Sequence, residues 1–316
     1  MAQSITDGDT LKQGGVTYRL YRIDAPELAQ TCPDGWPAGR IAATRLQALT
    51  AGRPIVCQEK DRDRYGRTVA ICRASGEDLG AKLVSEGLAW AFVHPLALLA
   101  VYHFVFTTIF RAGSMDGKSF SLFVAVALWP WLAAQEALQR GTVSIAGYAG
   151  LIRKVAFRHE LVVYASVAAT LALQFAGYLV VLVVLALFGE PVHFEGLLLA
   201  VPLWLVLAIA VTGLALALAA LQVFVKDVEH ILMPVLMILM YLTPILYPLS
   251  LVPDSMKPWV AANPFGYLVG RLRDALLDGR LGLAWSDALA VVVALAMFAA
   301  GRWVFLRLSP HFEDFV

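Results

Sequence analysis

The chain has 316 residues, of which 59% are hydrophobic and 16% are charged, and its formal net charge is +1 at pH 7. This composition excludes a wholly soluble protein, because residues 161–189, 196–225 and 231–253 contain no Asp, Glu, Lys or Arg, whereas a soluble helix keeps a polar face. Near residue 93 the share of charged residues falls from about a quarter to about an eighth, so the net charge averages two unlike parts.

The first 93 residues contain short alternating segments separated by turn signals. The pattern predicts turns at 7–10 and 14–15, strands at 16–23, 53–59 and 67–73, and helices at 37–49 and from Leu79 onward. We therefore expect a small OB-like β-barrel with helices packed on it, an α+β domain.

The rest of the chain predicts an all-α membrane domain of six transmembrane helices, because a helix needs roughly 20 apolar residues to cross a bilayer. The six apolar runs cover residues 88–110, 119–138, 161–189, 196–225, 231–253 and 281–306. Residues 1–12 lack the basic start and apolar run of a secretory signal, so the first hydrophobic helix is expected to direct the chain to the membrane.

Lys and Arg near the membrane ends predict the orientation, since they favour the cytoplasmic side. The loop after the second span carries Arg140, Arg153, Lys154 and Arg158, whereas the next loop carries Glu190 and Glu195. With an even number of spans, both termini are predicted to be cytoplasmic, in a bacterial inner membrane.

Proline recurs between the fifth and sixth spans, at Pro248, Pro253 and Pro264. This spacing predicts an outer re-entrant or interfacial segment, followed by a short amphipathic helix. On that helix Arg271 and Arg273 are expected to form a solvated face, with a site for an anionic substrate as the alternative.

Four short segments of the membrane half carry a family resemblance. They are residues 151–155 (LIRKV), 225–230 (VKDVEH), 241–248 (YLTPILYP) and 263–265 (NPF). In this order they resemble the permease subunit of ABC-2 type exporters, and among these the polysaccharide and O-antigen export permeases. The resemblance implies that the loop with Arg153 and Lys154 couples to an ATPase, and that the proline-rich segment caps the exit of a glycan path.

A search for an ATP-binding loop of the Gly-x4-Gly-Lys-Ser/Thr type finds none in the sequence. Gly117-Lys118-Ser119 ends like one, but Gly113 is one residue too close. ATP hydrolysis is therefore expected from a separate subunit. The expected working unit is a homodimer of permeases with two ATPases, surrounded by membrane lipid.

Three segments of residues 1–93 carry a second resemblance. They are Asp7-Gly8-Asp9-Thr10, then Arg19 spaced before Ile23-Asp24-Ala25-Pro26-Glu27, then Asp63-Arg64-Tyr65-Gly66-Arg67. Together they resemble the thermonuclease, or staphylococcal-nuclease-like, family.

This second resemblance implies phosphodiester hydrolysis of nucleic acid. Asp9 and Asp24 would supply hard oxygen ligands to Ca²⁺, and Glu27 would act as general base or orient the attacking water. Arg19 and Arg67 would grip the phosphate, because a guanidinium can bind it bidentately and stays charged.

The expected domains are a thermonuclease-like domain over residues 1–92, without the family's C-terminal helix, and a permease domain over residues 93–316. The join lies inside one predicted helix that begins at Leu79. A missing helix would destabilise so small a domain, so we expect nuclease activity to be absent or weak.

The three cysteines lack the spacing of a zinc site. Cys57 and Cys72 are expected on neighbouring strands and, in the cytoplasm, in the reduced form. Cys32 has no obvious partner.

Three interpretations of the whole chain stay open at this point: an export permease, a membrane-anchored Ca²⁺-dependent nuclease, and a fusion of the two with no function as a unit. A similar choice concerns five aromatic residues, which could stack on sugar rings in a glycan path or serve core packing and interfacial anchoring. They are Tyr102, Trp129, Trp131, Tyr241 and Tyr247.

Overall fold

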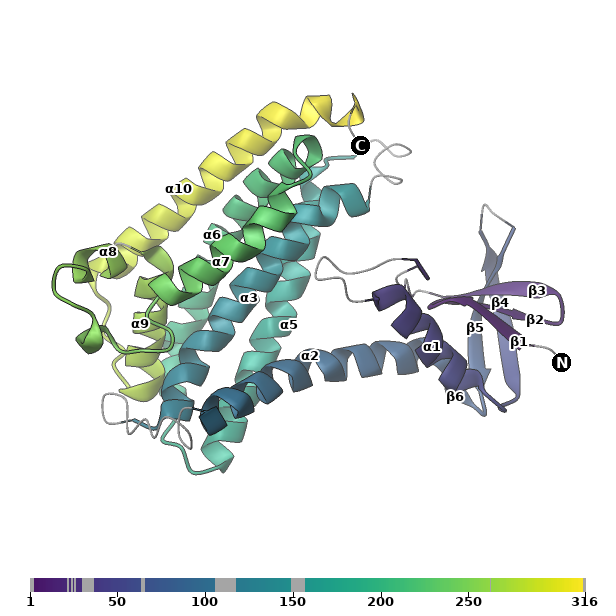
Figure 1. The fold of residues 1–316 in the computed structure, drawn as a ribbon, viewed down its shortest axis with the longest axis horizontal. Coiled ribbons are helices and arrows are strands. Elements are labelled where there is room, and N and C mark those ends of the chain that lie inside the picture. The colour runs from purple at the N-terminus through teal and green to yellow at the C-terminus, as the bar shows by residue number, and fades with distance from the viewer. Residues whose placement is uncertain are drawn as a thin grey trace. The chain divides into compact units, whose positions relative to one another are not determined.

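The structure is a computed structural model that describes residues 3–21, 23, 25, 27–29, 37–63, 66–105, 118–148, 157–261 and 263–314. The chain forms two compact units, Met1–His94 and Pro95–Val316 (Figure 1). The boundary between them lies inside one helix, α2 (Leu79–Phe104), as expected from the sequence.

The first unit is built on one sheet. Its strands are β1 (Gln3–Asp7), β2 (Thr10–Gln13), β3 (Val16–Leu20), β4 (Ile55–Arg62), β5 (Thr68–Ala74) and β6 (Glu77–Asp78). Their order is β1-β2-β3-β5-β4, with β3 parallel to β5 and β6 pairing with β5. Helix α1 (Ala38–Thr50) connects β3 to β4. This arrangement is consistent with the predicted OB-like fold.

Every second residue of β5 is buried, as in a strand with one face on a core. Helix α2 is attached to that core through Leu79, which is 1% exposed, and through Leu83. Arg45 of α1 holds α2 from a second side, with two of its nitrogens each 2.6 Å from a carboxylate oxygen of Glu86. The hydrogen bond from Arg45 lowers the pKa of Glu86.

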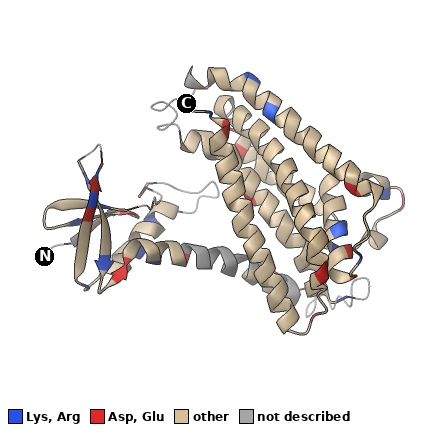
Figure 2. Ribbon diagram, turned by 180° about the vertical axis from the view of Figure 1, so that it is seen from behind, with Lys and Arg blue, Asp and Glu red and all other residues tan. Residues whose placement is uncertain are grey.

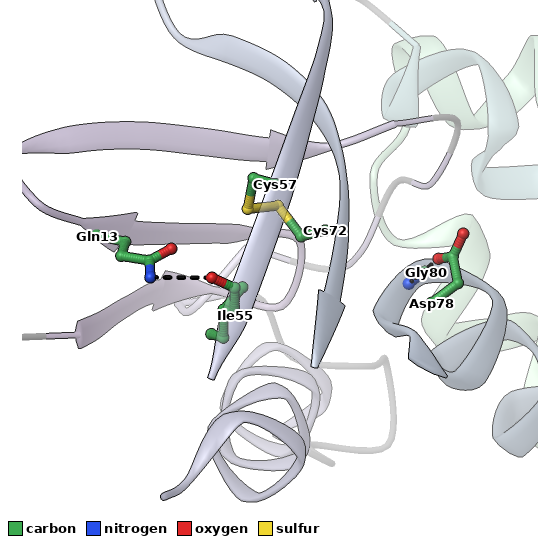
Figure 3. Close-up of a disulfide and its surroundings, with 6 residues drawn as sticks. All are labelled: Gln13, Ile55, Cys57, Cys72, Asp78 and Gly80. Carbon is green, nitrogen blue, oxygen red and sulfur yellow. Dashed lines mark hydrogen bonds between the residues drawn. A yellow bond between two sulfur atoms is a disulfide. The ribbon is translucent and has the colours of Figure 1, made fainter. Parts of the chain in front are cut away.

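Cys57 on β4 and Cys72 on β5 are register partners and form a disulfide (Figure 3). The prediction of neighbouring strands is confirmed, whereas the prediction of reduced thiols is wrong for this structure. Directly opposed positions place the two Cα atoms 4.0 Å apart, so the sulfur atoms meet across the hairpin. The disulfide closes the β4–β5 hairpin, whose turn leads to Arg67.

The second unit consists of helices. They are α3 (Phe120–Gly147), α5 (Glu160–Leu187), α6 (Leu197–Phe224), α7 (Val228–Leu242), α8 (Lys257–Ala261), α9 (Pro264–Leu277) and α10 (Trp285–Leu308), with 3₁₀ segments at Phe194–Gly196, Leu249–Leu251 and Ser309–Asp314. Within the described part of the chain, four helices are long and apolar enough to cross a membrane: Phe120–Gly147, Glu160–Leu187, Phe194–Phe224 and Trp285–Phe312. Charged residues are sparse along them (Figure 2). A polytopic α-helical unit with four candidate spans is therefore present, and the predicted count of six is not confirmed.

The structure describes the two remaining predicted spans to different extents. The span expected at 88–110 falls on α2 and on residues 106–110, which lie outside the described residues. The span expected at 231–253 is not one helix, because α7 ends at Leu242 after 15 residues. Thr243 is extended there, the conformation favoured by a residue that precedes proline.

Pro130 lies inside α3 and cannot donate a hydrogen bond, which leaves the carbonyl of Val126 without its helical partner. The buried Tyr178 of α5 donates its hydroxyl to that carbonyl at 3.1 Å. Trp129 donates its indole N–H to the carbonyl of Gln174 at 2.9 Å. These two bonds join α3 to α5 across the apolar core of the bundle.

Candidate functional site

The turn between β1 and β2 brings Asp9 and Arg19 together. Thr10, which follows Asp9, is the register partner of Arg19 on β3. The Nε of Arg19 donates to Asp9 at 3.2 Å, and the hydroxyl of Thr10 donates to the other carboxylate oxygen at 2.7 Å. Asp9 is only 4% exposed, so its carboxylate is fixed in orientation.

Asp7 lies beside this pair, and its Oδ1 accepts the backbone N–H of Asp9 at 3.2 Å. Burial raises the pKa of Asp7, and the neighbouring Asp9 raises it further. Two carboxylates so close together suit a hard cation such as Ca²⁺, which would supply opposite charge. Among the described residues no group of three His, Cys, Asp or Glu side chains could hold a metal ion. Asp24, the other expected ligand, lies outside the described residues.

Arg67 lies at the end of the β4–β5 turn. Its Nε donates to Asp63 at 2.6 Å, and its backbone N–H donates to the same carboxylate at 2.9 Å. Arg19 pairs in register with Val69 of β5, the strand that follows Arg67. Glu27 is exposed. Arg19 thus lies against Asp9, whereas the carboxylate bound by Arg67 is that of Asp63.

The proline-rich segment of the second unit is held by side chains from α9 and from the residue before it. Asn263 caps α9, with its Oδ1 accepting the N–H of Phe265 at 3.0 Å, and its Nδ2 donates to the Thr243 hydroxyl at 2.8 Å. Two of the resembling segments, 241–248 and 263–265, are therefore in direct contact.

The expectation of a solvated face for Arg271 and Arg273 is wrong. Arg271 pairs with Asp287 of α10 at 2.8 Å, and its side chain is 11% exposed. Arg273 donates to the carbonyls of Pro244 and Ile245, each at 2.5 Å, and lies over the ring of Phe123. Periodicity placed these arginines on a polar face, but the partners that bury them come from distant parts of the chain.

A family model described as "ABC-2 type transporter" matches residues 81–277. The chain belongs to the ABC-2 type transporter family. A second model, "Staphylococcal nuclease homologue", matches residues 17–97. Both predicted resemblances are confirmed, and the two matches overlap on α2.

Relatives of the two halves are different proteins. "O-antigen export system permease protein RfbA" of Klebsiella pneumoniae is 22% identical over 76% of this chain and 92% of its own length. "Succinoglycan biosynthesis protein ExoI" of Rhizobium meliloti (strain 1021) is 41% identical over 27% of this chain and 48% of its own length. "Micrococcal nuclease" of Shigella flexneri is 36% identical over 28% of this chain and 55% of its own length.

The chain therefore spans about half the length of its nuclease-side relatives and most of the length of RfbA. It is an ABC-2 permease homologue with a staphylococcal-nuclease-like N-terminal part.

Within the ABC-2 part, the residues expected to couple to an ATPase, Arg153 and Lys154, lie outside the described residues. The aromatic residues have distinct surroundings. Trp129 and Trp131 are both 3% exposed in the helical core, where Trp131 contacts Phe265 edge-on, whereas Tyr241 is 57% exposed. Core packing thus accounts for the two tryptophans.

Gly39, at the start of α1, is a residue of the nuclease-like site that sequence reasoning missed. A Cβ placed on Gly39 would lie 1.7 Å from the backbone carbonyl oxygen of Glu27. We predict that Gly39→Ala displaces the Glu27 segment and destabilises the first unit by about 1–3 kcal/mol, as overpacking usually does. Hydrogen exchange of the full-length protein in detergent would measure this as lost protection in α1 and β3.

The matched control is Gly80→Ala, because a Cβ there meets no atom closer than 3.4 Å. Equal protection in Gly39→Ala and the unaltered protein would show that the Glu27 segment moves aside without cost.

Proposed function

We propose that this chain is the membrane-spanning permease subunit of an exporter that moves a polysaccharide or a lipid-linked glycan. The observation that carries the proposal is the alignment with 92% of the length of RfbA, together with the family match over residues 81–277. A separate ATPase subunit would power transport, and Arg153 and Lys154 would lie in the loop that contacts it. The permease would act as a homodimer in the inner membrane.

In this proposal the permease domain comprises residues 93–316 and crosses the membrane six times. Four of these spans are the four candidate helices. The other two would be formed by α2 and by α7 together with the proline-rich turn. Residues 1–92 form the nuclease-like domain, and both termini are cytoplasmic.

The test is vanadate-sensitive export in cells that also produce the partner ATPase. Replacing Arg153 and Lys154 together by glutamine should abolish export and co-purification of the ATPase. Arg140→Gln is the matched control, because Arg140 already pairs with Glu136 at 2.8 Å on α3. A membrane-inserted protein that never co-purifies with an ATPase would overturn the proposal.

A second function is favoured by the cluster of Asp7, Asp9 and Arg19. We propose that the first unit binds Ca²⁺ through Asp9 and Asp24, with Glu27, Arg19 and Arg67 as the residues that would act on a nucleic-acid phosphodiester. Ca²⁺ would supply charge for the phosphate and a bound water. Cleavage is expected to be weak or absent, so binding is the better test.

The raised pKa of Asp7 sets the sign of the pH dependence. The fold favours protonated Asp7, so its contribution to stability is present below the unfolded-state pKa and is lost as pH rises through the folded-state pKa. At pH 7 we predict that Ca²⁺ increases protection from hydrogen exchange in residues 3–21, and that Asp9→Asn prevents this. Asp61→Asn, at an exposed position of β4, is the control. No effect of Ca²⁺ on the unaltered protein would refute the site.

The disulfide opposes the cytoplasmic placement of the first unit, because cytoplasmic thiols are kept reduced. Trapping free thiols in intact cells with a permeant maleimide decides the question. Labelled Cys57 and Cys72 support a cytoplasmic first unit, and an intact disulfide places that unit in an oxidising compartment.

A further inference from the structure

A buried carboxylate stands at the beginning of α5. Glu160 is 3% exposed, and one of its oxygens accepts a hydrogen bond from Arg158, two residues earlier. Its other oxygen lies 3.3 Å from Nε of Arg302, on α10, and makes no hydrogen bond to any described residue. A buried carboxylate is costly unless it is paired, so the two arginines are needed where they lie.

A second set of contacts joins the same place to the end of the chain. The ring of His159 stacks on Phe312 with the centroids 6.0 Å apart, and Phe312 is completely buried. Phe312 in turn packs against Phe224, the last residue of α6, and against Phe305 of α10. Residues 157–160, the end of α6 and the end of α10 therefore meet around one carboxylate and one aromatic cluster.

These contacts lie directly after the loop that contains Arg153 and Lys154. Residues 157–160 connect that part of the chain to α5, and there Glu160 lies between Arg158 and Arg302 of α10. Helix α10 also packs along α6, so a shift at Glu160 is passed to two long helices rather than one.

We infer that Glu160 is a positioning residue for coupling: its pairing with Arg158 and Arg302 makes α5 and α10 move together when an ATPase acts on the preceding loop. This inference rests on the proposed export function. It assigns a role to a residue that touches neither ATP nor the transported glycan.

The test compares ATP hydrolysis with export in cells and vesicles that contain the full chain and its ATPase. Phosphate release measures hydrolysis, and periodate–hydrazide labelling of intact cells measures surface carbohydrate. Glu160→Gln should keep the ATPase bound and hydrolysing, while export per ATP falls about tenfold, the size of a typical coupling between sites. Unchanged export per ATP in Glu160→Gln would overturn the inference.

The double variant Glu160→Gln with Arg302→Gln separates positioning from stability. Removing both charges leaves neither Glu160 nor Arg302 without its counter-charge, so the protein should fold normally. Positioning predicts that export per ATP stays low, because the link is still missing. Recovery of coupling in the double variant would mean that Glu160 only neutralises Arg302, and would overturn the inference.

Glu229→Gln is the control, since Glu229 lies in the first turn of α7 and its carboxylate approaches His230 no closer than 3.6 Å. If the unaltered protein neither binds an ATPase nor supports export, the proposed function fails, independently of Glu160.

Discussion

Replacing Gly301 by leucine should prevent α10 from packing on α6. A Cβ on Gly301 would lie 1.8 Å from the carbonyl oxygen of Gly213, and a Cβ on Gly213 would lie 2.5 Å from backbone atoms of α10. Membrane helices pack through such small residues, because close backbone approach is a main source of their attraction. We expect a loss of about 3–5 kcal/mol, above the usual cost of overpacking.

The measurement is the midpoint of thermal unfolding in detergent, supported by the fraction of monodisperse protein. Gly270→Leu on α9 is the matched control, because a Cβ at Gly270 has no atom within 4 Å. If Gly301→Leu and Gly270→Leu unfold at the same temperature, the close crossing of α6 and α10 does not hold the bundle together.

The sequence predicts the positions of helices well where an apolar run is long and free of charged residues. Three charge-free runs locate α5, α6 and the start of α7, since no soluble helix tolerates such composition. It fails at residues 231–253, because hydrophobicity alone does not show that Pro244 ends the helix at Leu242. The dipeptide Thr243-Pro244 is the local signal for this helix end, because the residue before a proline disfavours the helical conformation.

The sequence predicts only those residues of the nuclease-like site that belong to short recognisable segments. Asp9 and Arg19 are recognisable from short segments, and strand pairing then brings them together. Gly39 could not be found in this way, because its role depends on the backbone of Glu27, twelve positions earlier in the chain. Contacts between distant segments decide such positions, and a single sequence does not record them.

The arginines of α9 show the same limit in the membrane half. An amphipathic pattern places Arg273 on a polar stripe, and the usual inference is contact with water or headgroups. In the structure Arg273 meets the residues after α7, where the helix has stopped and the carbonyls that follow need donors, whereas Arg271 pairs with Asp287 of α10. Arg273 of α9 therefore serves the proline-rich turn.

Replacing Arg273 by methionine should release that turn. The guanidinium donates to Pro244 and Ile245, and Ile245 is completely buried, so the variant leaves buried carbonyls unpaired. Each such group costs about 1–3 kcal/mol, and the contact with the ring of Phe123 is lost as well. We expect a total near 3–5 kcal/mol.

Hydrogen exchange at residues 241–252 of the full-length protein measures the effect directly, because release of the turn precedes loss of the bundle. Arg280→Met is the control: Arg280 is 71% exposed and reaches Asp274 only at 3.7 Å. Arg273→Lys adds a second test. Lysine keeps the positive charge but lacks the planar guanidinium group, whose N–H groups can donate to two carbonyls at once. Full protection in the lysine variant would show that charge alone, without the planar geometry of arginine, holds the proline-rich turn.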